Sequence, residues 1–171
     1  MSRRPYLDAV RNGLVVFDGA FGTYIQTLDL DPEAFGGPAL DGCNEMLAVT
    51  RPDLIAQMHD DFLAVGVDAI ETATFGSFSL VLNEYGLAGR AHEITLAAAR
   101  IARERADVWE QRDGRARYVA GSMGPGTKLP TLGHIDFAEL RDSYHEQARA
   151  LLEGGVDLFL IETCMDLLQA K

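Results

Sequence analysis

The pattern of hydrophobic residues along the chain predicts four short buried strands separated by helices. Each of the four apolar runs is rich in β-branched or aromatic residues and too short to form a helix; they cover residues 14–17, 67–70, 118–121 and 156–161. Apolar residues recur at helical spacing over residues 54–65, 94–108 and 137–151. A strand followed by a helix, repeated along the chain, predicts an α/β fold with a parallel sheet and right-handed crossovers.

Polar residues and glycines predict where two of these helices begin and end. Thr50 and Asp53 have the spacing of a capping box, and Gly66 would end the helix that follows them. Asp136 is suited to begin the later helix, which Gly155 would end. By contrast, residues 29–50 show no periodicity, and unpatterned segments of this length are usually functional lids or disorder.

Carboxylates follow three of the predicted strands. Asp18 comes after the first strand, Glu71 after the second and Glu162 after the fourth. The carboxyl ends of parallel strands lie on one side of a sheet, where ligands bind, so we expect these acids to share one mouth. The third strand runs into a glycine- and proline-rich loop over residues 121–135, which carries Lys128 and is interpreted as an ordinary connection.

The turn after the first predicted strand is a candidate ligand site. Asp18 is followed by Gly19, Ala20, Phe21 and Gly22, and a helix is compatible with residues 20–28. Backbone N–H groups in such a turn would suit a carboxylate or a phosphate. Alternatively, the aspartate caps the helix and the glycines only permit the turn. Neither a P-loop nor a dinucleotide-binding motif is present.

Two of the strand-end acids could bind an ammonium group. Asp18 and Glu162 at the mouth, with a carboxylate held by the turn, would together recognise an α-amino acid. A structural ion pair with a neighbouring lysine or arginine is the alternative for Glu162. Glu71 occupies the analogous place in the second strand, because "VDAIET" and "VDLFLIET" form a weak internal repeat. The repeat alone therefore does not favour Glu162 over Glu71.

Composition narrows the classes of partner. The 171 residues carry a net charge of −11, which disfavours a nucleic-acid surface. No segment approaches the length of about 20 apolar residues that a membrane span requires. Residues 1–12 fit a short amphipathic leader helix, with Leu7 and Val10 on one face, better than a signal peptide. Two cysteines give no disulfide framework, and we expect a reducing, cytoplasmic location.

The cysteines and histidines do not predict a metal site. Cys43 and Cys164 have no partner at ligand spacing, whereas a catalytic zinc site needs three protein ligands. The four histidines lie singly along the chain. We therefore expect no metal ligands in this chain.

Five stretches of the chain, taken in order, resemble a known family. They are "FDGAFGTYIQ", "GCNEMLAVTRPDLIAQMH", "GVDAIETATFGSF", "YVAGSMGPGTKLPTLG" and "GVDLFLIETCMDLLQAK". Their order and spacing are similar to those of the homocysteine-binding module of cobalamin-dependent methionine synthase, in the homocysteine S-methyltransferase family. The resemblance runs from about residue 13 to Lys171.

The resemblance implies a (β/α)₈ TIM barrel that transfers a methyl group from methylcobalamin to the zinc-activated thiol of homocysteine, in methionine biosynthesis. Asp18 and Glu162 match the acids that hold the substrate amino group, and Thr74 is placed among the substrate-binding residues. The turn at residues 19–22 matches the backbone that receives the substrate carboxylate. The zinc ligands of the family are three cysteines on later strands, beyond Lys171.

The chain also departs from the family pattern. It provides about the first four of the eight β/α units, so we expect the N-terminal half of a barrel that is inactive alone. Its partners would be homocysteine, the remaining half of the barrel and downstream folate and cobalamin modules. Ala73 stands where the family usually has asparagine.

The alternative functions are a methyltransferase that uses betaine or S-methylmethionine, and a non-catalytic amino-acid-binding or assembly module.

Overall fold

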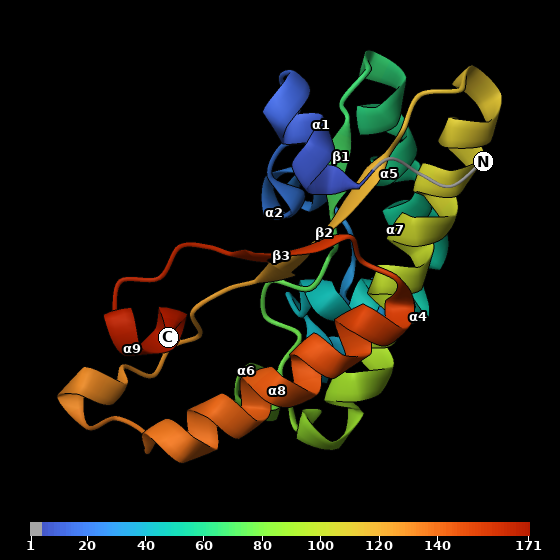
Figure 1. The fold of residues 1–171 in the computed structure, drawn as a ribbon. Helices are drawn as coiled ribbons and strands as arrows, with labels where there is room; N and C mark the ends of the chain where they lie inside the picture. The colour runs from blue at the N-terminus through green and yellow to red at the C-terminus, as the bar shows by residue number, and fades with distance from the viewer. Residues whose placement is uncertain (1–4) are drawn as a thin grey trace.

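A parallel three-stranded sheet forms the centre of the computed structural model, which describes residues 5–171 (Figure 1). Its strands are β1 (Ala69–Glu71), β2 (Tyr118–Met123) and β3 (Leu158–Ile161), in the spatial order β1-β2-β3. Ala69 pairs with Tyr118, and Ala120 pairs with Leu158. The predicted α/β fold with a parallel sheet is therefore confirmed.

The first predicted strand, residues 14–17, does not form a strand. Only Phe17 bridges to the sheet, opposite Ala69 of β1 and in the parallel sense. The N–H of Asp18 donates to the carbonyl of Ala69 at 3.0 Å, so the segment still runs along the edge of β1. Leu14 is 94% exposed and Val16 is 54% exposed, because nothing among the described residues pairs with the outer side of this segment. The prediction of a buried strand here was wrong.

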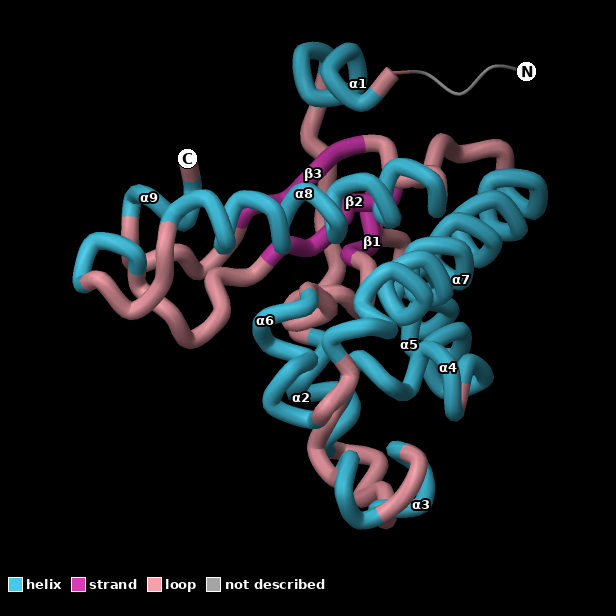
Figure 2. Tube along the Cα trace, turned by 90° about the horizontal axis from the view of Figure 1, so that it is seen from below, coloured by secondary structure: helices cyan, strands magenta, loops and turns pink. Residues whose placement is uncertain are grey.

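Three long helices cover one face of the sheet: α5 (Pro52–Val65), α7 (Ala91–Asp113) and α8 (Phe137–Gly154) (Figure 2). Ile70 of β1 and Val119 of β2 pack in one apolar cluster with Leu63 of α5 and alanines of α7. Gly121 of β2 brings the backbone close to α8, since a Cβ there would lie 3.0 Å from Leu151. These contacts place the helices on the side of the sheet opposite Glu71 and Ala120.

The leader helix lies at the amino end of the strands. It is α1 (Tyr6–Asn12), and residues 1–4 of the predicted leader lie outside the described part of the chain. The ring of Tyr6 packs edge-on against Tyr118 at 5.5 Å and Phe17 at 6.4 Å. Leu7 and Val10 remain largely exposed, so the expected apolar face of this helix is not buried.

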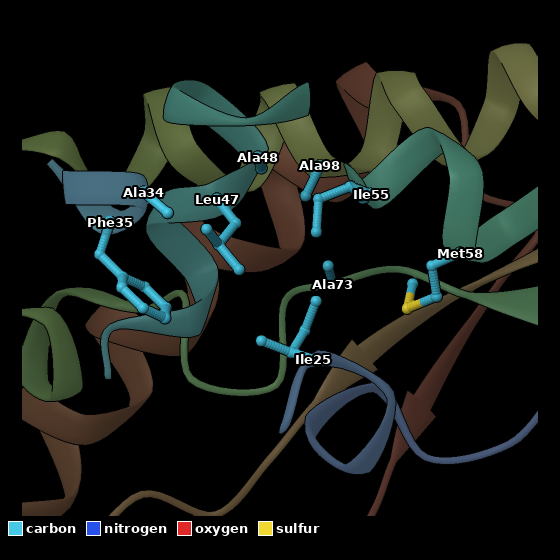
Figure 3. Close-up of a cluster of buried hydrophobic side chains, with 9 residues drawn as sticks. All are labelled: Ile25, Ala34, Phe35, Leu47, Ala48, Ile55, Met58, Ala73 and Ala98. Carbon is cyan, nitrogen blue, oxygen red and sulfur yellow. The ribbon is translucent and has the colours of Figure 1, made fainter. Parts of the chain in front are cut away.

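The segment predicted to be a lid or disordered is instead folded into short helices. They are α3 (Pro32–Phe35), the 3₁₀ helices η1 (Pro38–Leu40) and η2 (Asn44–Met46), and α4 (Leu47–Thr50). Before them, α2 (Phe21–Gln26) forms within residues 20–28, where a helix was expected. Phe35 and Leu47 from this segment pack with Ile55 of α5 and Ala73 in a buried cluster (Figure 3). The elements are too short for a helical period to emerge, which is why the pattern missed them.

The helix ends follow the sequence signals in part. Asp136 caps α8 by accepting the N–H of Ala138, and Gly66 and Gly155 end α5 and α8 in left-handed conformations. The capping box at Thr50 was wrong. Its hydroxyl donates to the carbonyl of Met46 within the preceding helix, and α5 begins without a side-chain cap.

Shorter elements complete the connections. After β1 come α6 (Ser79–Leu82), η3 (Asn83–Tyr85) and η4 (Ala88–Arg90); η5 (Pro130–Leu132) follows β2, and α9 (Leu167–Ala170) follows β3. Figure 1 shows α9 near the N-terminal end of α8, well away from α1. Ile161 of β3 is 56% exposed, so this edge strand is not buried as predicted. Within residues 5–171, no helix has the length and apolar character of a membrane span.

Candidate substrate-binding site

A cavity of about 270 Å³ opens at the carboxyl ends of the strands. Its walls combine acidic side chains, the glycine turn and apolar side chains: Asp18, Gly19, Ala20, Phe21, Gly22, Asn44, Glu45, Met58, Glu71, Thr72, Phe75, Ser122 and Glu162. The structure therefore brings Asp18 and the turn that follows it together with Glu71 and Glu162, which are distant in the sequence. This is the arrangement expected of the strand exits of a parallel sheet.

Asp18 is held against β1 by hydrogen bonds. Both of its carboxylate oxygens accept the backbone N–H of Glu71, each at 3.1 Å. Helix α2 begins after Ala20 and has no side-chain cap, so the alternative in which Asp18 caps this helix was wrong. The carboxylate instead faces the cavity from the edge of the sheet.

Glu162 directly follows β3 and lines the same cavity. The hydroxyl of Ser122 donates to its Oε1 at 2.5 Å. No lysine or arginine among residues 5–171 forms an ion pair with it, so a structural ion pair is not what holds this side chain in the described chain. An acid without a cationic partner, at the mouth of a parallel sheet, is available to a cationic ligand.

The acids in the cavity repel one another and are poorly solvated. Burial raises the pKa of Asp18 to about 7, and the charges on Glu71 and Glu162 add to this effect, while the N–H of Glu71 opposes it. Burial and the charge on Glu162 also raise the pKa of Glu71 to about 7. An ammonium group placed among these carboxylates would relieve the repulsion.

The turn at residues 19–22 forms the wall of the cavity opposite the sheet. A Cβ on Gly19 would lie 3.2 Å from the ring of Phe62, so the turn packs tightly against α5 there. A Cβ on Gly22 would meet nothing within 4 Å, which leaves open space beside the cavity. The first N–H groups of α2 have no acceptor within the helix and are free to bind an anion.

Sequence reasoning missed Asn44, Glu45 and Met58 as cavity residues. Glu45 accepts the N–H of Gly76 at 2.9 Å and so ties η2 to the loop after β1. Burial raises the pKa of Glu45 as well. Asn44 and Glu45 of η2 lie in the stretch without periodicity, so the sequence offered no signal for them. Met58 was predicted on the buried face of its helix, which indicated a core residue and not a cavity residue.

Three residues singled out in the sequence do not line this cavity. Thr74 is fully buried, and its hydroxyl donates to the carbonyl of Ser122 at 2.7 Å. Ala73 points into the apolar cluster beneath α5 (Figure 3). Lys128 is exposed in the loop after β2, and its carbonyl accepts from Gln169 at 2.9 Å. None of them contacts the ligand space directly.

The described residues do not form a site for the zinc ion that the resemblance implies. Within residues 5–171, no group of three or more histidines, cysteines or acids is placed to hold a metal ion. Cys43 is buried beneath η2, where burial raises the pKa of its thiol to about 11. Cys164 contacts the carbonyl of Glu162 at 3.4 Å, and burial raises its pKa as well. Neither thiol is set up to bind a metal as a thiolate.

The family of the chain is shown by comparison with known proteins. The family described as Homocysteine S-methyltransferase matches residues 15–171. The chain belongs to the homocysteine S-methyltransferase family. Among curated relatives, the methionine synthase of Mycobacterium tuberculosis is 48% identical over 165 residues, and that of Mycobacterium leprae is 44% identical over the same length. These matches cover 96% of the chain but only 14% and 13% of the relatives.

Solved structures of a homocysteine methyltransferase share the fold of the chain. The oxidized form of the homocysteine methyltransferase MmuM from Escherichia coli superposes with a TM-score of 0.78 and 20% identity, covering 95% of this chain and 58% of that one. The metallated form gives a TM-score of 0.76 and covers 57% of that chain. The chain thus has the fold of part of that protein.

Proposed function

We propose that this chain supplies the amino-acid-binding part of a homocysteine S-methyltransferase of the methionine synthase type. In this proposal, Asp18 and Glu162 bind the ammonium group of homocysteine. The observation that carries it is that these two acids, from opposite edges of the sheet, line one cavity. At an effective dielectric constant of about 20, a carboxylate attracts an ammonium 4 Å away by roughly 4 kcal/mol, so two such acids favour a cation strongly.

The substrate carboxylate would lie at the glycine turn. Residues 19–22 form the wall opposite the sheet, and the N-terminal N–H groups of α2 offer hydrogen bonds to an anion. The thiol-bearing side chain would then extend toward Met58 and Phe75, which give the cavity its apolar part. A cationic group, an anionic group and a short apolar arm together describe a sulfur-containing α-amino acid.

We further propose that the complete fold is a (β/α)₈ barrel to which residues 13–171 contribute the first four units. Supporting this, four extended segments run in parallel and three long helices cover one face. The chain also covers little more than half of the E. coli protein that it resembles in fold. Catalysis, zinc and methylcobalamin would then depend on parts of the protein beyond those described, together with folate and cobalamin modules.

Calorimetry with homocysteine and two trimmed analogues tests the binding proposal. 4-Mercaptobutanoate lacks the ammonium group, and 3-mercaptopropylamine lacks the carboxylate. Wild type should bind homocysteine and bind both analogues more weakly. Asp18→Asn and Glu162→Gln should each lower homocysteine affinity about tenfold or more, because each removes a charged hydrogen bond, while leaving 4-mercaptobutanoate binding nearly unchanged.

The matched control is Glu104→Gln on the exposed surface of α7, which removes one negative charge away from the cavity. It should leave all three affinities unchanged. Equal losses for homocysteine and 4-mercaptobutanoate in the Asp18 and Glu162 variants would contradict the assignment of these acids to the ammonium group. No binding of homocysteine to wild type would contradict the proposed function as a whole.

A non-catalytic amino-acid-binding module is the second candidate. It needs only the acids and the turn that line the cavity, without a metal ion. The two candidates separate in a methyl-transfer assay of the full protein with zinc supplied or chelated. Zinc-dependent formation of methionine supports the enzyme, whereas homocysteine capture that never yields methionine supports the binding module.

A further inference from the structure

Two threonines after β1 and one serine at the end of β2 form a closed ring of hydrogen bonds beneath the cavity. The N–H of Ser122 donates to Oγ1 of Thr72 at 3.0 Å, and the hydroxyl of Thr74 donates to the carbonyl of Ser122 at 2.7 Å. The two threonine hydroxyls lie 2.6 Å apart. All three side chains are almost completely buried, so water does not compete for these groups.

The directions of these bonds follow from the number of protons available. A hydroxyl has one proton to donate, and Thr74 gives its proton to the carbonyl of Ser122. The proton between the two threonines must therefore come from Thr72. Thr72 in turn accepts the N–H of Ser122, so each threonine hydroxyl donates once and accepts once. The ring uses both backbone groups of Ser122 and leaves its side-chain hydroxyl free.

That free hydroxyl is directed at Glu162. Ser122 donates to Oε1 of Glu162 at 2.5 Å, a short bond of the kind formed with a charged acceptor. The remaining oxygen, Oε2, has a long contact of 3.5 Å with the hydroxyl of Thr163. One carboxylate oxygen is thus fixed by the ring, and the other is left for a ligand.

We propose that Thr72, Thr74 and Ser122 are positioning residues that orient Glu162 toward the ammonium group of the bound amino acid. The proposal rests on the proposed function and assigns Thr74 an indirect role in place of a substrate contact. Gln147 of α8 anchors the ring from below, since its side-chain amide donates to the carbonyl of Thr74 at 2.7 Å. The ring therefore connects a helix on the covered face to the acid in the cavity.

Removing the serine hydroxyl tests this role. In the full 171-residue chain, Ser122→Ala should lower the affinity for homocysteine about tenfold, since Glu162 loses the bond that orients it. Its affinity for 4-mercaptobutanoate should stay within about twofold of wild type, because that analogue has no ammonium group. A variant that merely loosened the fold would weaken both ligands alike, so the ratio of the two affinities is the diagnostic quantity.

The threonines offer a second pair of variants. Thr72→Val and Thr74→Val keep the side-chain shape but break the ring, and they should lower the ratio of homocysteine to 4-mercaptobutanoate affinity. Thr72→Ser and Thr74→Ser keep the hydroxyls and should restore it. Ser143→Ala is the matched control: it removes a buried hydroxyl that bonds Ser79 at 2.6 Å, away from the cavity, and should leave the ratio unchanged.

The outcomes separate the two proposals. If wild type discriminates strongly between homocysteine and 4-mercaptobutanoate but Ser122→Ala keeps the full ratio, the positioning role is overturned and the proposed function stands. If wild type shows no preference for homocysteine over 4-mercaptobutanoate, the ammonium site itself is wrong and the positioning role falls with it. Loss of the ratio in Ser122→Ala and in Thr72→Val, together with a wild-type ratio in Thr72→Ser, would support both.

Discussion

Asp18 and Glu71, two acids 53 positions apart, are joined by a hydrogen bond from the backbone N–H of Glu71 to both carboxylate oxygens of Asp18, each at 3.1 Å. This contact fixes the edge segment against β1 and points the first acid into the cavity. It also brings two carboxyl groups near each other and near Glu162. Holding these carboxyl groups close together should favour a cationic ligand, and it should cost stability when the groups are ionised.

The pH dependence of stability should reveal that cost. The pKa of Asp18 rises from 3.8, and that of Glu71 from 4.5, to about 7 in the folded chain. The folded state then binds more protons than the unfolded state between about pH 4 and 7, so stability should fall as pH rises through this window. Glu71→Gln should be more stable than wild type at pH 8 by roughly 1 kcal/mol, allowing for solvent screening, and equal to it at pH 4.

Urea denaturation of both proteins at the two pH values measures this difference. An advantage of Glu71→Gln that is the same at pH 4 and pH 8 would show that carboxylate repulsion is not its cause.

Gly22 should separate ligand binding from stability. A Cβ there meets nothing within 4 Å and lies in the second position of α2, where alanine favours helix by up to about 1 kcal/mol. Gly22→Ala should therefore be as stable as wild type or more stable, yet bind homocysteine several-fold more weakly because the methyl group narrows the cavity beside the turn. Thermal unfolding and calorimetry measure the two effects, and unchanged affinity would place the ligand elsewhere.

Gly154 marks a close approach between α8 and α7. A Cβ on Gly154 would lie 2.3 Å from Cβ of Ala99, which would force the two helices apart. Gly154→Ala should destabilise the chain by about 1–3 kcal/mol, in spite of the better helix propensity of alanine. Gly89→Ala is the control, because a Cβ there meets nothing within 4 Å. Equal stability of the two variants in urea would contradict the close packing.

The apolar surface at β3 should make the 171-residue chain self-associate. Ile161, Met165 and Leu167 are all more than half exposed on or just after this edge strand. Edge strands with exposed apolar side chains pair readily with other chains. Ile161→Lys combined with Leu167→Lys should shift the sedimentation of the chain toward the monomer. Val65→Lys, which replaces an equally exposed residue at the end of α5, should leave self-association unchanged. Monomeric wild type at high concentration would contradict this expectation.

Strand exits were the most predictable feature of the molecule. Asp18 and Glu162 follow apolar runs, and a parallel arrangement alone places such residues at one end of the sheet. Residues 14–17 were predicted to form a strand and do not. Strand formation depends on pairing with neighbouring strands, and the local pattern around Phe17 carries no information about those neighbours. For the same reason, Ile161 was expected to be buried and is exposed.

The polar ring and the wall at η2 could not be derived from the sequence. Ser122 is a small polar residue one position past a predicted strand, which is a weak signal. Thr72 and Thr74 resemble any strand-end threonines until their hydrogen bonds are seen. Glu45 lies in a segment whose short helices have no period. Its place in the cavity depends on long-range packing against the loop at Gly76.

A crystal structure of the chain with bound L-homocysteine tests the central claim most directly. We expect the amino nitrogen within about 3 Å of carboxylate oxygens from both Asp18 and Glu162, with the substrate carboxylate at the turn formed by residues 19–22. An amino acid bound with its ammonium group in contact with neither acid, or bound outside this cavity, would contradict it.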